Sequence, residues 1–147
     1  MNYEITLTRI VDGDTIIADI DLGFDIILKS QTIRLNGIDT PEIHSEDEIE
    51  KKQGLISKQK LTELLTNQNS PLAFNPKNNI ILFVEKNNYK DKYGRVLGTI
   101  FVSTININEY LISNSYAVAY NGENKDKIKD LHLKNRQVLV NRKELIL

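Results

Sequence analysis

Apolar and polar residues alternate along the first forty residues in a pattern typical of β-strands. Between residues 3 and 11 the odd positions are mostly apolar, which is the period of a half-buried strand. Asp12-Gly13 is a dipeptide favoured in tight turns, and residues 15–20 continue as a second strand, so we expect a hairpin. A third extended stretch covers residues 26–28 and 32–35 and ends near Ile38. The pattern therefore predicts a three-stranded meander.

Helical spacing replaces this alternation at residue 47. From there to residue 66 the apolar side chains fall on one helical face with lysines opposite. These side chains are Ile49, Leu55 or Ile56, Leu61, Leu64 and Leu65. Residues 67–79, which contain Pro71 and Pro76, are typical of a polar loop. Residues 80–84 then predict a buried strand, and residues 96–102 predict another.

Two helices are predicted in the last third of the chain. Residues 108–112 suit a short helix, and Asn114 can take the left-handed conformation at its end. A basic helix begins near Asn124 and runs toward the C-terminus. The predicted order of elements is three strands, a helix, two strands and further helices. This order predicts an α+β fold that is mainly β barrel: a five-stranded OB-fold barrel with about three packed helices. With no repeat or linker, residues 1–147 are expected to form a single domain.

Composition narrows the chemistry that the chain can perform. It has no cysteine, which excludes disulfides, thiolate metal sites and a cysteine nucleophile. Two histidines, His44 and His132, are too few for a typical zinc site, and we place both at the surface or behind the direct ligands of a site. No apolar run approaches the roughly 20 residues that span a bilayer, so no membrane partner is expected. The start of the chain has no secretory leader, which favours a cytoplasmic protein, or a secreted one if a leader has been removed.

The net charge of −1 conceals an asymmetry along the sequence. Residues 1–50 contain three Lys or Arg against twelve Asp or Glu, whereas residues 51–147 contain sixteen against eight. The first third is therefore suited to hold a cation, and the remainder is suited to face phosphate groups. The alternative is that the charges only solvate the surface, and composition alone favours that alternative. A net charge near zero argues against strong long-range attraction to DNA.

Three short segments carry the candidate chemistry. The first, Asp12-Gly13-Asp14-Thr15, is by itself most typical of a hairpin turn, because glycine accepts positive φ and aspartate bonds its own backbone. In a functional interpretation, Asp14 projects from the start of the second strand as a ligand for a hard metal ion.

The second segment, residues 39–42, also has two interpretations. Asp39 and Glu42 have the spacing of a capping box around Pro41, which slightly favours a helix start for this segment alone. Alternatively, Asp39 binds metal, Glu42 faces the attacking water, and the proline turns the Thr40 carbonyl outward as an oxygen ligand. Arg34 lies on the preceding strand, on the face opposite its apolar neighbours, where its guanidinium can bind phosphate.

The third segment is Asp-Lys-Tyr-Gly-Arg at residues 91–95, which alone is most typical of a solvated hairpin turn. As a site it offers Arg95 to a reacting phosphate, Lys92 to a flanking phosphate and Tyr93 to stacking. Tyr120 either stacks on a base or fills the core. The basic residues of the last helix favour a solvated face over a specific nucleic-acid patch; they are Lys125, Lys127, Lys129, Lys134 and Arg136.

In order and spacing, the three segments and both arginines resemble the staphylococcal-nuclease-like (thermonuclease) family. The resemblance runs from about residue 5 to residue 120, with weaker agreement at Gly54, Asn108, Leu111, Ile112 and Tyr120. It implies an OB-fold barrel and a Ca²⁺-dependent hydrolysis of DNA and RNA that leaves 3′-phosphate and 5′-hydroxyl ends. Mg²⁺ is the alternative ion, because the donors are all oxygens.

The resemblance also implies a role for each site residue. The cation is held by Asp14, Asp39 and the Thr40 carbonyl. The catalytic residues are Arg34 and Arg95, which stabilise transition-state charge, and Glu42, which orients or deprotonates the attacking water. The flanking phosphate and base are bound by Lys92, Tyr93 and Tyr120.

Two features depart from the family and keep other functions open. The chain is slightly acidic, and Asn121-Gly122 follows Tyr120 where some members have a second tyrosine nearby. One alternative is a non-cleaving OB-fold module that binds nucleic acid or protein. Another is a nuclease limited to one structured or invading nucleic acid, because the acidic run at residues 46–50 would repel ordinary duplex. An inhibitor or activator protein is a further expected partner, and the oligomeric state is left open.

Overall fold

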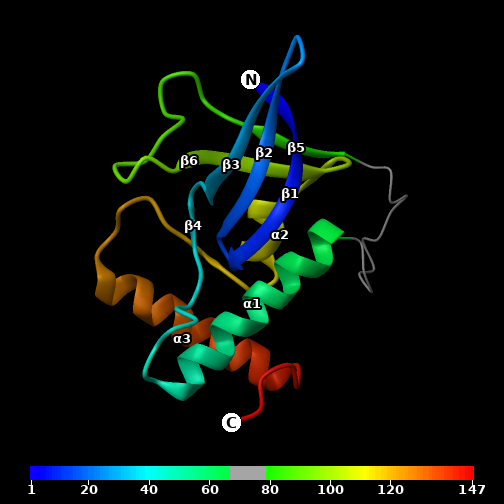
Figure 1. Ribbon diagram of the computed structural model, residues 1–147. Helices are drawn as coiled ribbons and strands as arrows, with labels where there is room; N and C mark the ends of the chain where they lie inside the picture. The colour runs from blue at the N-terminus through cyan, green and yellow to red at the C-terminus, as the bar shows by residue number, and fades with distance from the viewer. Residues whose placement is uncertain (67–78) are drawn as a thin grey trace.

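The computed structural model describes residues 1–66 and 79–147 of the chain. In these residues five strands form a closed barrel, drawn in Figure 1. They are β1 (Asn2–Asp12), β2 (Thr15–Gly23), β3 (Ile26–Leu35), β5 (Ile80–Phe83) and β6 (Val96–Val102). The antiparallel order β3-β2-β1-β5-β6 closes on itself because β3 also pairs with β6, in parallel. The meander and the OB-fold-like barrel expected from the sequence are therefore confirmed.

Three short strands and three helices complete the described structure. Strand β4 (Ile38–Asp39) pairs with β8 (Val118–Ala119), and β7 (Ile105–Asn106) pairs with the end of β6. The helices are α1 (Glu48–Thr66), α2 (Ile107–Ser113) and α3 (Lys125–Asn141). In Figure 1, α1 and α3 lie at the same end of the barrel, and β4 leads from the barrel toward them. No helix of this part of the chain is long and apolar enough to cross a membrane.

The core forms where the inward faces of the strands meet α1, α2 and the last residues of the chain. Its fully buried aliphatic side chains include Ile16, Ile33, Leu35, Leu61, Ile100, Leu111 and Leu139. Burying one such side chain stabilises a fold by about 1.5–3 kcal/mol. Of the two alternatives left open for the buried face of α1, Ile56 packs against the core, whereas Leu55 is 44% exposed.

The conformation expected for Asn114 is wrong. Asn114 has φ −105°, and it is Ser115 that takes the left-handed conformation after α2, with φ 68°. The backbone N–H and the side-chain amide of Asn114 both donate hydrogen bonds to the Tyr110 carbonyl. These bonds hold Asn114 in the helical turn, so the left-handed residue comes one position later. The polar loop expected at residues 67–79 falls, except for its last residue, outside the described residues.

The helix start considered for residues 39–42 is also wrong. Strand β4 ends at Asp39, and no helix begins before Glu48. The start of α1 is instead capped by Asp47, whose Oδ1 accepts hydrogen bonds from the backbone N–H groups of Ile49 and Glu50. Residues 39–42 are thereby left as an irregular segment beside the end of the barrel.

Two close contacts fix this segment and the turn that precedes it. A Cβ atom on Gly54 of α1 would lie 2.5 Å from the Pro41 carbonyl oxygen, so only glycine lets the helix approach the chain this closely. The buried side chain of Asn108 accepts a hydrogen bond from the Ile100 N–H and donates to the carbonyls of Asn36 and Gly98. Helices α1 and α2 therefore hold the backbone on both sides of β4.

Candidate active site

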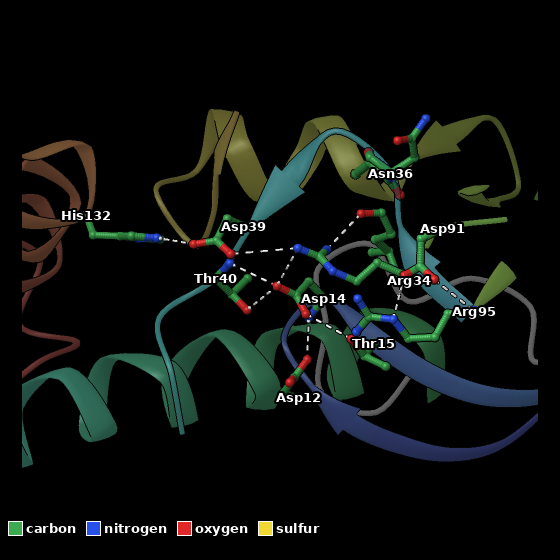
Figure 2. A network of polar contacts seen from close by, with 12 residues as sticks. Asp12, Asp14, Thr15, Arg34, Asn36, Asp39, Thr40, Asp91, Arg95 and His132 are labelled. Atoms are coloured by element: carbon green, nitrogen blue, oxygen red, sulfur yellow. Dashed lines mark hydrogen bonds and ion pairs between the residues drawn. The ribbon is translucent and has the colours of Figure 1, made fainter. Parts of the chain in front are cut away.

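Asp14 is the hub of a polar network at the end of the barrel where β1 turns into β2 (Figure 2). Its side chain is nearly buried, and its Oδ2 accepts hydrogen bonds from the backbone N–H and the hydroxyl of Thr40, both at 3.1 Å. Its Oδ1 accepts a hydrogen bond of 3.0 Å from the Thr15 hydroxyl. The hairpin turn and the site are thus the same feature, since the turn delivers Asp14 to the segment after β4.

Arg34 reaches the same place from β3, where it pairs across the ladder with Thr15 of β2. Its Nη2 lies 3.4 Å from Asp14 Oδ2 and 3.7 Å from Asp39 Oδ1, while Nη1 donates a hydrogen bond of 3.0 Å to the Leu35 carbonyl. The guanidinium is therefore held between the two carboxylates, in a side chain that is only 13% exposed. Both carboxylates point at one common region of space.

The two aspartates of the β1–β2 turn have different pKa values. Burial raises the pKa of Asp12 to about 7, with further contributions from the hydrogen bond and the negative charge of Asp14. Burial also acts to raise the pKa of Asp14, but a hydrogen bond with Asp12, the Arg34 charge and the Thr40 N–H together lower it below the usual value. Asp14 is thus the more acidic member of the pair, and Asp12 takes up a proton as the pH falls below about 7.

Asp39 joins the network from the end of β4 and is more exposed than Asp14, at 32% of its side chain. Its Oδ2 lies 2.7 Å from Nε2 of His132, which projects from α3 (Figure 2). The other ring nitrogen of His132, Nδ1, is buried and has no partner in the described residues. This contact puts His132 directly behind a candidate ligand, which is one of the two positions that the sequence predicts for it.

The loop before β6 is organised by Asp91. Its Oδ1 accepts hydrogen bonds of 2.9 Å from the N–H groups of Tyr93 and Arg95, and its Oδ2 lies 2.6 Å from Nε of Arg95. Burial works against ionisation, yet these hydrogen bonds and the Arg95 charge lower the pKa of Asp91. Lys92 and Arg95 both lie over the ring of Tyr93, at 5.2 Å and 5.5 Å from its centre. The segment is therefore a turn, as its simplest interpretation held, and it also presents two cations and an aromatic ring.

The structure brings four of the nine predicted site residues into direct contact: Asp14, Arg34, Asp39 and Thr40. Arg95 appears at the far end of the same view, bonded to Asp91 (Figure 2). Glu42 is exposed, as are Lys92 and Tyr93. Tyr120 is 38% exposed and lines a pocket beside α3, so it does not fill the core.

The donor set fits a hard cation. In the described residues no three His, Asp or Glu side chains are grouped so that they could hold a metal ion by themselves. Asp14 and Asp39 both lie beside the positive guanidinium of Arg34, so their carboxylates face the same region. Two carboxylates with a nearby Thr40 suit an oxygen-preferring ion that completes its coordination with water and phosphate oxygens.

Sequence patterns missed three residues that shape the site. Asp12 and Asp91 belong to the segments singled out, but their effects on Asp14 and Arg95 depend on burial and hydrogen bonding that the sequence does not display. His132 is 93 residues from its partner Asp39, and no spacing rule connects them. Only the packing of α3 beside β4 brings them together.

Comparison with known proteins places the chain in a family. The family model described as staphylococcal nuclease homologue matches residues 32–145. The SPbeta prophage-derived endonuclease YokF of Bacillus subtilis is 30% identical over 135 residues, which cover 91% of this chain and 40% of that protein. Endonuclease YncB of the same species is 31% identical over 129 residues, covering 86% and 53% of the two chains.

A thermonuclease of Staphylococcus hyicus is 32% identical over 111 residues, which cover 76% of this chain and 56% of that protein. The chain thus spans about half the length of these relatives. The family model covers well over half of the chain, and the barrel and helices agree with the fold that the resemblance implied. The chain belongs to the family of staphylococcal nuclease homologues.

Proposed function

We propose that this chain is a metal-dependent nuclease that hydrolyses phosphodiester bonds of DNA and also of RNA. The observation that carries the proposal is the convergence of Asp14 and Asp39, from separate strands, on the guanidinium of Arg34 at 3.4 Å and 3.7 Å. Carboxylates beside an arginine suit a cation and a phosphate that share one site. The relatives named endonuclease and thermonuclease support the same activity.

The cation is proposed to be Ca²⁺, with Mg²⁺ as the alternative, held by Asp14, Asp39 and the Thr40 carbonyl. When bound, such an ion polarises a phosphoryl oxygen and makes a nearby water more acidic. The lowered pKa of Asp14 keeps this carboxylate charged and ready to bind, whereas the pKa of Asp12 is raised to about 7. Asp14 is therefore the member of the pair that we assign to the ion.

The other residues act on the phosphodiester itself. Arg34 and Arg95 stabilise the negative charge that grows on the phosphate oxygens, because fixed cations act where charge develops. Glu42 is exposed, so its carboxylate is accessible to orient the attacking water or take its proton. The water oxygen bonds to phosphorus as the bond to the 5′ oxygen breaks, which gives 3′-phosphate and 5′-hydroxyl ends. Lys92 and Tyr93 bind the phosphate and base of a flanking nucleotide, and Tyr120 contacts a flanking base.

The test is a cleavage assay on plasmid, single-stranded DNA and RNA, each with Ca²⁺, Mg²⁺ or EDTA. Arg95→Ala and Glu42→Ala should each lower kcat by about 10²–10³, the usual cost of losing one such group, without changing the urea midpoint of unfolding. Lys86→Ala, an exposed lysine of the same β5–β6 connection, is the control and should cleave like the wild type. Wild-type rates in both site variants would refute the assignment.

A second outcome would favour the binding module. If the oligonucleotides bind with a clear isotherm but remain intact in every metal, the chain holds nucleic acid without cutting it. The presence of both acids and both arginines argues against that outcome.

A further inference from the structure

A cavity of about 600 Å³ lies against Asp39 on the side away from the barrel. It is an open pocket lined by residues of β4, the start of α1, the segment after β8 and the helix α3, and we call it the α3 pocket. Its walls include Asp39, Tyr120, Lys125, Lys129, His132 and Leu133. The volume falls in the range of roughly 300–1,000 Å³ that is usual for pockets that bind small ligands.

The α3 pocket continues the proposed active site in one direction. Figure 2 shows His132 at one end of the polar network and the Asp91–Arg95 pair at the other, with Asp39, Arg34 and Asp14 between them. His132 and Asp39 both line the pocket, whereas Lys92, Tyr93 and Arg95 do not. If the scissile phosphate of a nucleic-acid strand lies at the polar network, the nucleotide on one side of it lies at the Lys92–Arg95 loop. The nucleotide on the other side then lies at the α3 pocket.

The side of the α3 pocket formed by α3 has the chemistry of a nucleotide site. Lys125 and Lys129 stand one helical turn apart on the same face of the helix, and neither forms an ion pair in the described part of the chain. Tyr120 and Leu133 are 38% and 42% exposed, which leaves an aromatic and an aliphatic surface free to contact a base. Cations for phosphate beside apolar surfaces for bases are the combination that holds single strands.

The opposite wall has the opposite charge. It is formed by Asp47 and Glu50, which are held in place by local hydrogen bonds at the start of α1. A phosphate is repelled from this wall and attracted to α3, while the amino groups of a base can donate to carboxylates. The two walls therefore favour one orientation of a nucleotide, with its phosphate toward α3 and its base edge toward α1.

We propose that the α3 pocket binds one unpaired nucleotide of the substrate, next to the scissile phosphate on the flank opposite the Lys92–Arg95 loop. Lys125 and Lys129 bind its phosphate, and Tyr120 and Leu133 contact its base. This inference rests on the proposed nuclease function. It adds a second binding site for the substrate strand, formed by α3. It also gives a role to two lysines whose charges, from the sequence alone, are expected only to solvate the helix.

The test uses two double variants that remove the same charge from the same helix. Lys125→Ala/Lys129→Ala removes the lysines that line the α3 pocket, and Lys127→Ala/Lys134→Ala removes two lysines that do not. The substrates are a dinucleotide with one phosphodiester and two trinucleotides that extend it by one nucleotide at the 5′ or the 3′ end. Products are separated by mass so that cleavage at each bond is measured on its own.

In the wild type, extension at one end should raise kcat/KM for the original bond by about tenfold, the effect of 1.4 kcal/mol of binding. The ratio of extended to unextended kcat/KM should fall to near one in Lys125→Ala/Lys129→Ala and persist in Lys127→Ala/Lys134→Ala. Equal ratios in the two double variants, or no gain from extension at either end, would overturn the proposal.

A binding measurement separates failure of this inference from failure of the proposed function. The affinity of the same trinucleotides, fluorescently labelled, is measured in EDTA by anisotropy. If the protein cleaves nothing but Lys125→Ala/Lys129→Ala weakens binding about tenfold more than the control does, the pocket stands and the nuclease assignment fails. If the protein cleaves and both variants bind alike, the pocket assignment fails alone.

Discussion

His132 shows how one side chain from a distant element can set the behaviour of a candidate ligand. Its Nε2 lies 2.7 Å from Asp39 Oδ2, so it fixes the direction of that carboxylate. Groups that hydrogen-bond a metal ligand typically change metal affinity by about 10–100-fold when they are removed. We therefore expect His132→Ala to weaken Ca²⁺ binding by roughly that factor, measured by calorimetric titration.

The control for this prediction is the chain's other histidine. His44 is exposed, so His44→Ala should bind Ca²⁺ like the wild type. His132→Gln, which keeps an N–H donor on the side chain, should lose less affinity than His132→Ala. Identical Ca²⁺ affinities in the two alanine variants would show that His132 does not position Asp39.

Asp91 plays a comparable part for Arg95. Its two oxygens hold the turn and the guanidinium, with the shortest contact at 2.6 Å. In Asp91→Asn the backbone bonds can persist, but the charged partner of Arg95 is lost. We expect kcat to fall about tenfold, less than the ~10²–10³ expected for Arg95→Ala, which removes the cation itself. Asp25→Asn, at the exposed tip of the β2–β3 hairpin, is the charge-matched control and should leave kcat unchanged.

The pKa of Asp91 also predicts how this loop responds to pH. Because folding lowers that pKa, the contact stabilises the loop at every pH above the usual value of 3.8 and is lost as pH falls through the lower value in the folded state. Amide exchange of Tyr93 and Arg95 should therefore show no loss of protection between neutral and mildly acidic pH. A loss of protection near neutral pH would contradict this assignment of charge.

At the residue scale, the sequence was informative where a local segment carries its own chemistry. Asp14, Asp39 and Arg34 could be selected because each lies in a short recognisable segment, and the structure places them within one network. The partners that tune them could not be selected, because the effect of Asp12 depends on burial and that of His132 on tertiary packing. The roles of Glu42, Lys92 and Tyr93 stay predictions, since these side chains are exposed in the structure.

At the scale of elements, the close approach of α1 to the segment after β4 gives a direct prediction. In most helix interiors Gly→Ala stabilises by about 1 kcal/mol, because alanine has the higher helix propensity. At Gly54 the new Cβ would lie 2.5 Å from the Pro41 oxygen and 3.0 Å from Ile43 Cγ2, and overpacking of this kind typically costs about 1–3 kcal/mol. We expect Gly54→Ala to lower the free energy of unfolding by on the order of 1–2 kcal/mol.

Urea unfolding measures this change, with Lys52→Ala as the control at an exposed position of the same helix. The control should be neutral or slightly stabilising. Because Pro41 is two residues from Asp39, Gly54→Ala should also weaken Ca²⁺ binding. An increase in stability on Gly54→Ala would mean that the helix can move away from Pro41 at no cost.

The elements themselves were predicted well because each has a clear period. Alternation gave the meander, and helical spacing from residue 47 gave α1 to within one residue of its start. The segment 39–42 was ambiguous because its residue types suit both a helix start and a metal site, and only tertiary contacts from Asp14 and Gly54 decide against the helix. The resemblance recognised from short segments ended near residue 120, whereas the family model reaches residue 145 and so includes α3, whose sequence carries no local signature.

For the whole molecule, the charge asymmetry of the sequence is reflected in the site. The acids Asp14 and Asp39 come from the first third of the chain, and the cations of the β5–β6 loop and of α3 come from the remainder. The two arginines of the site are already paired, however. Arg34 is paired with Asp14 and Asp39, and Arg95 is paired with Asp91. Neither arginine is therefore an unpaired cation before a phosphate binds.

The small number of cations beside the site that form no ion pair predicts a weak dependence of binding on salt. Of the cations beside the site, Lys92, Lys125, Lys129 and Arg136 form no ion pair in the described residues. Arg136 donates a hydrogen bond to the side chain of Gln53, which leaves the three lysines for phosphates. For a single strand, log Kobs changes with log[salt] by about −0.7 for each phosphate neutralised, so three contacts give a slope of about −2. Proteins that make 6–10 phosphate contacts lose about 10³–10⁵ in affinity between roughly 50 and 200 mM salt, far more than expected here.

The slope can be measured by anisotropy with a labelled single-stranded oligonucleotide in EDTA over that salt range. Removing Lys125 and Lys129 together should reduce its magnitude by about 1.4, and removing Lys127 and Lys134 should leave it unchanged. A wild-type slope steeper than about −4 would mean that most lysines of α3 contact the strand, and that the basic part of the sequence acts as a diffuse surface. A slope near −2 that responds only to the pocket lysines would mean that binding depends on a few placed cations, which suits a protein with a net charge of −1.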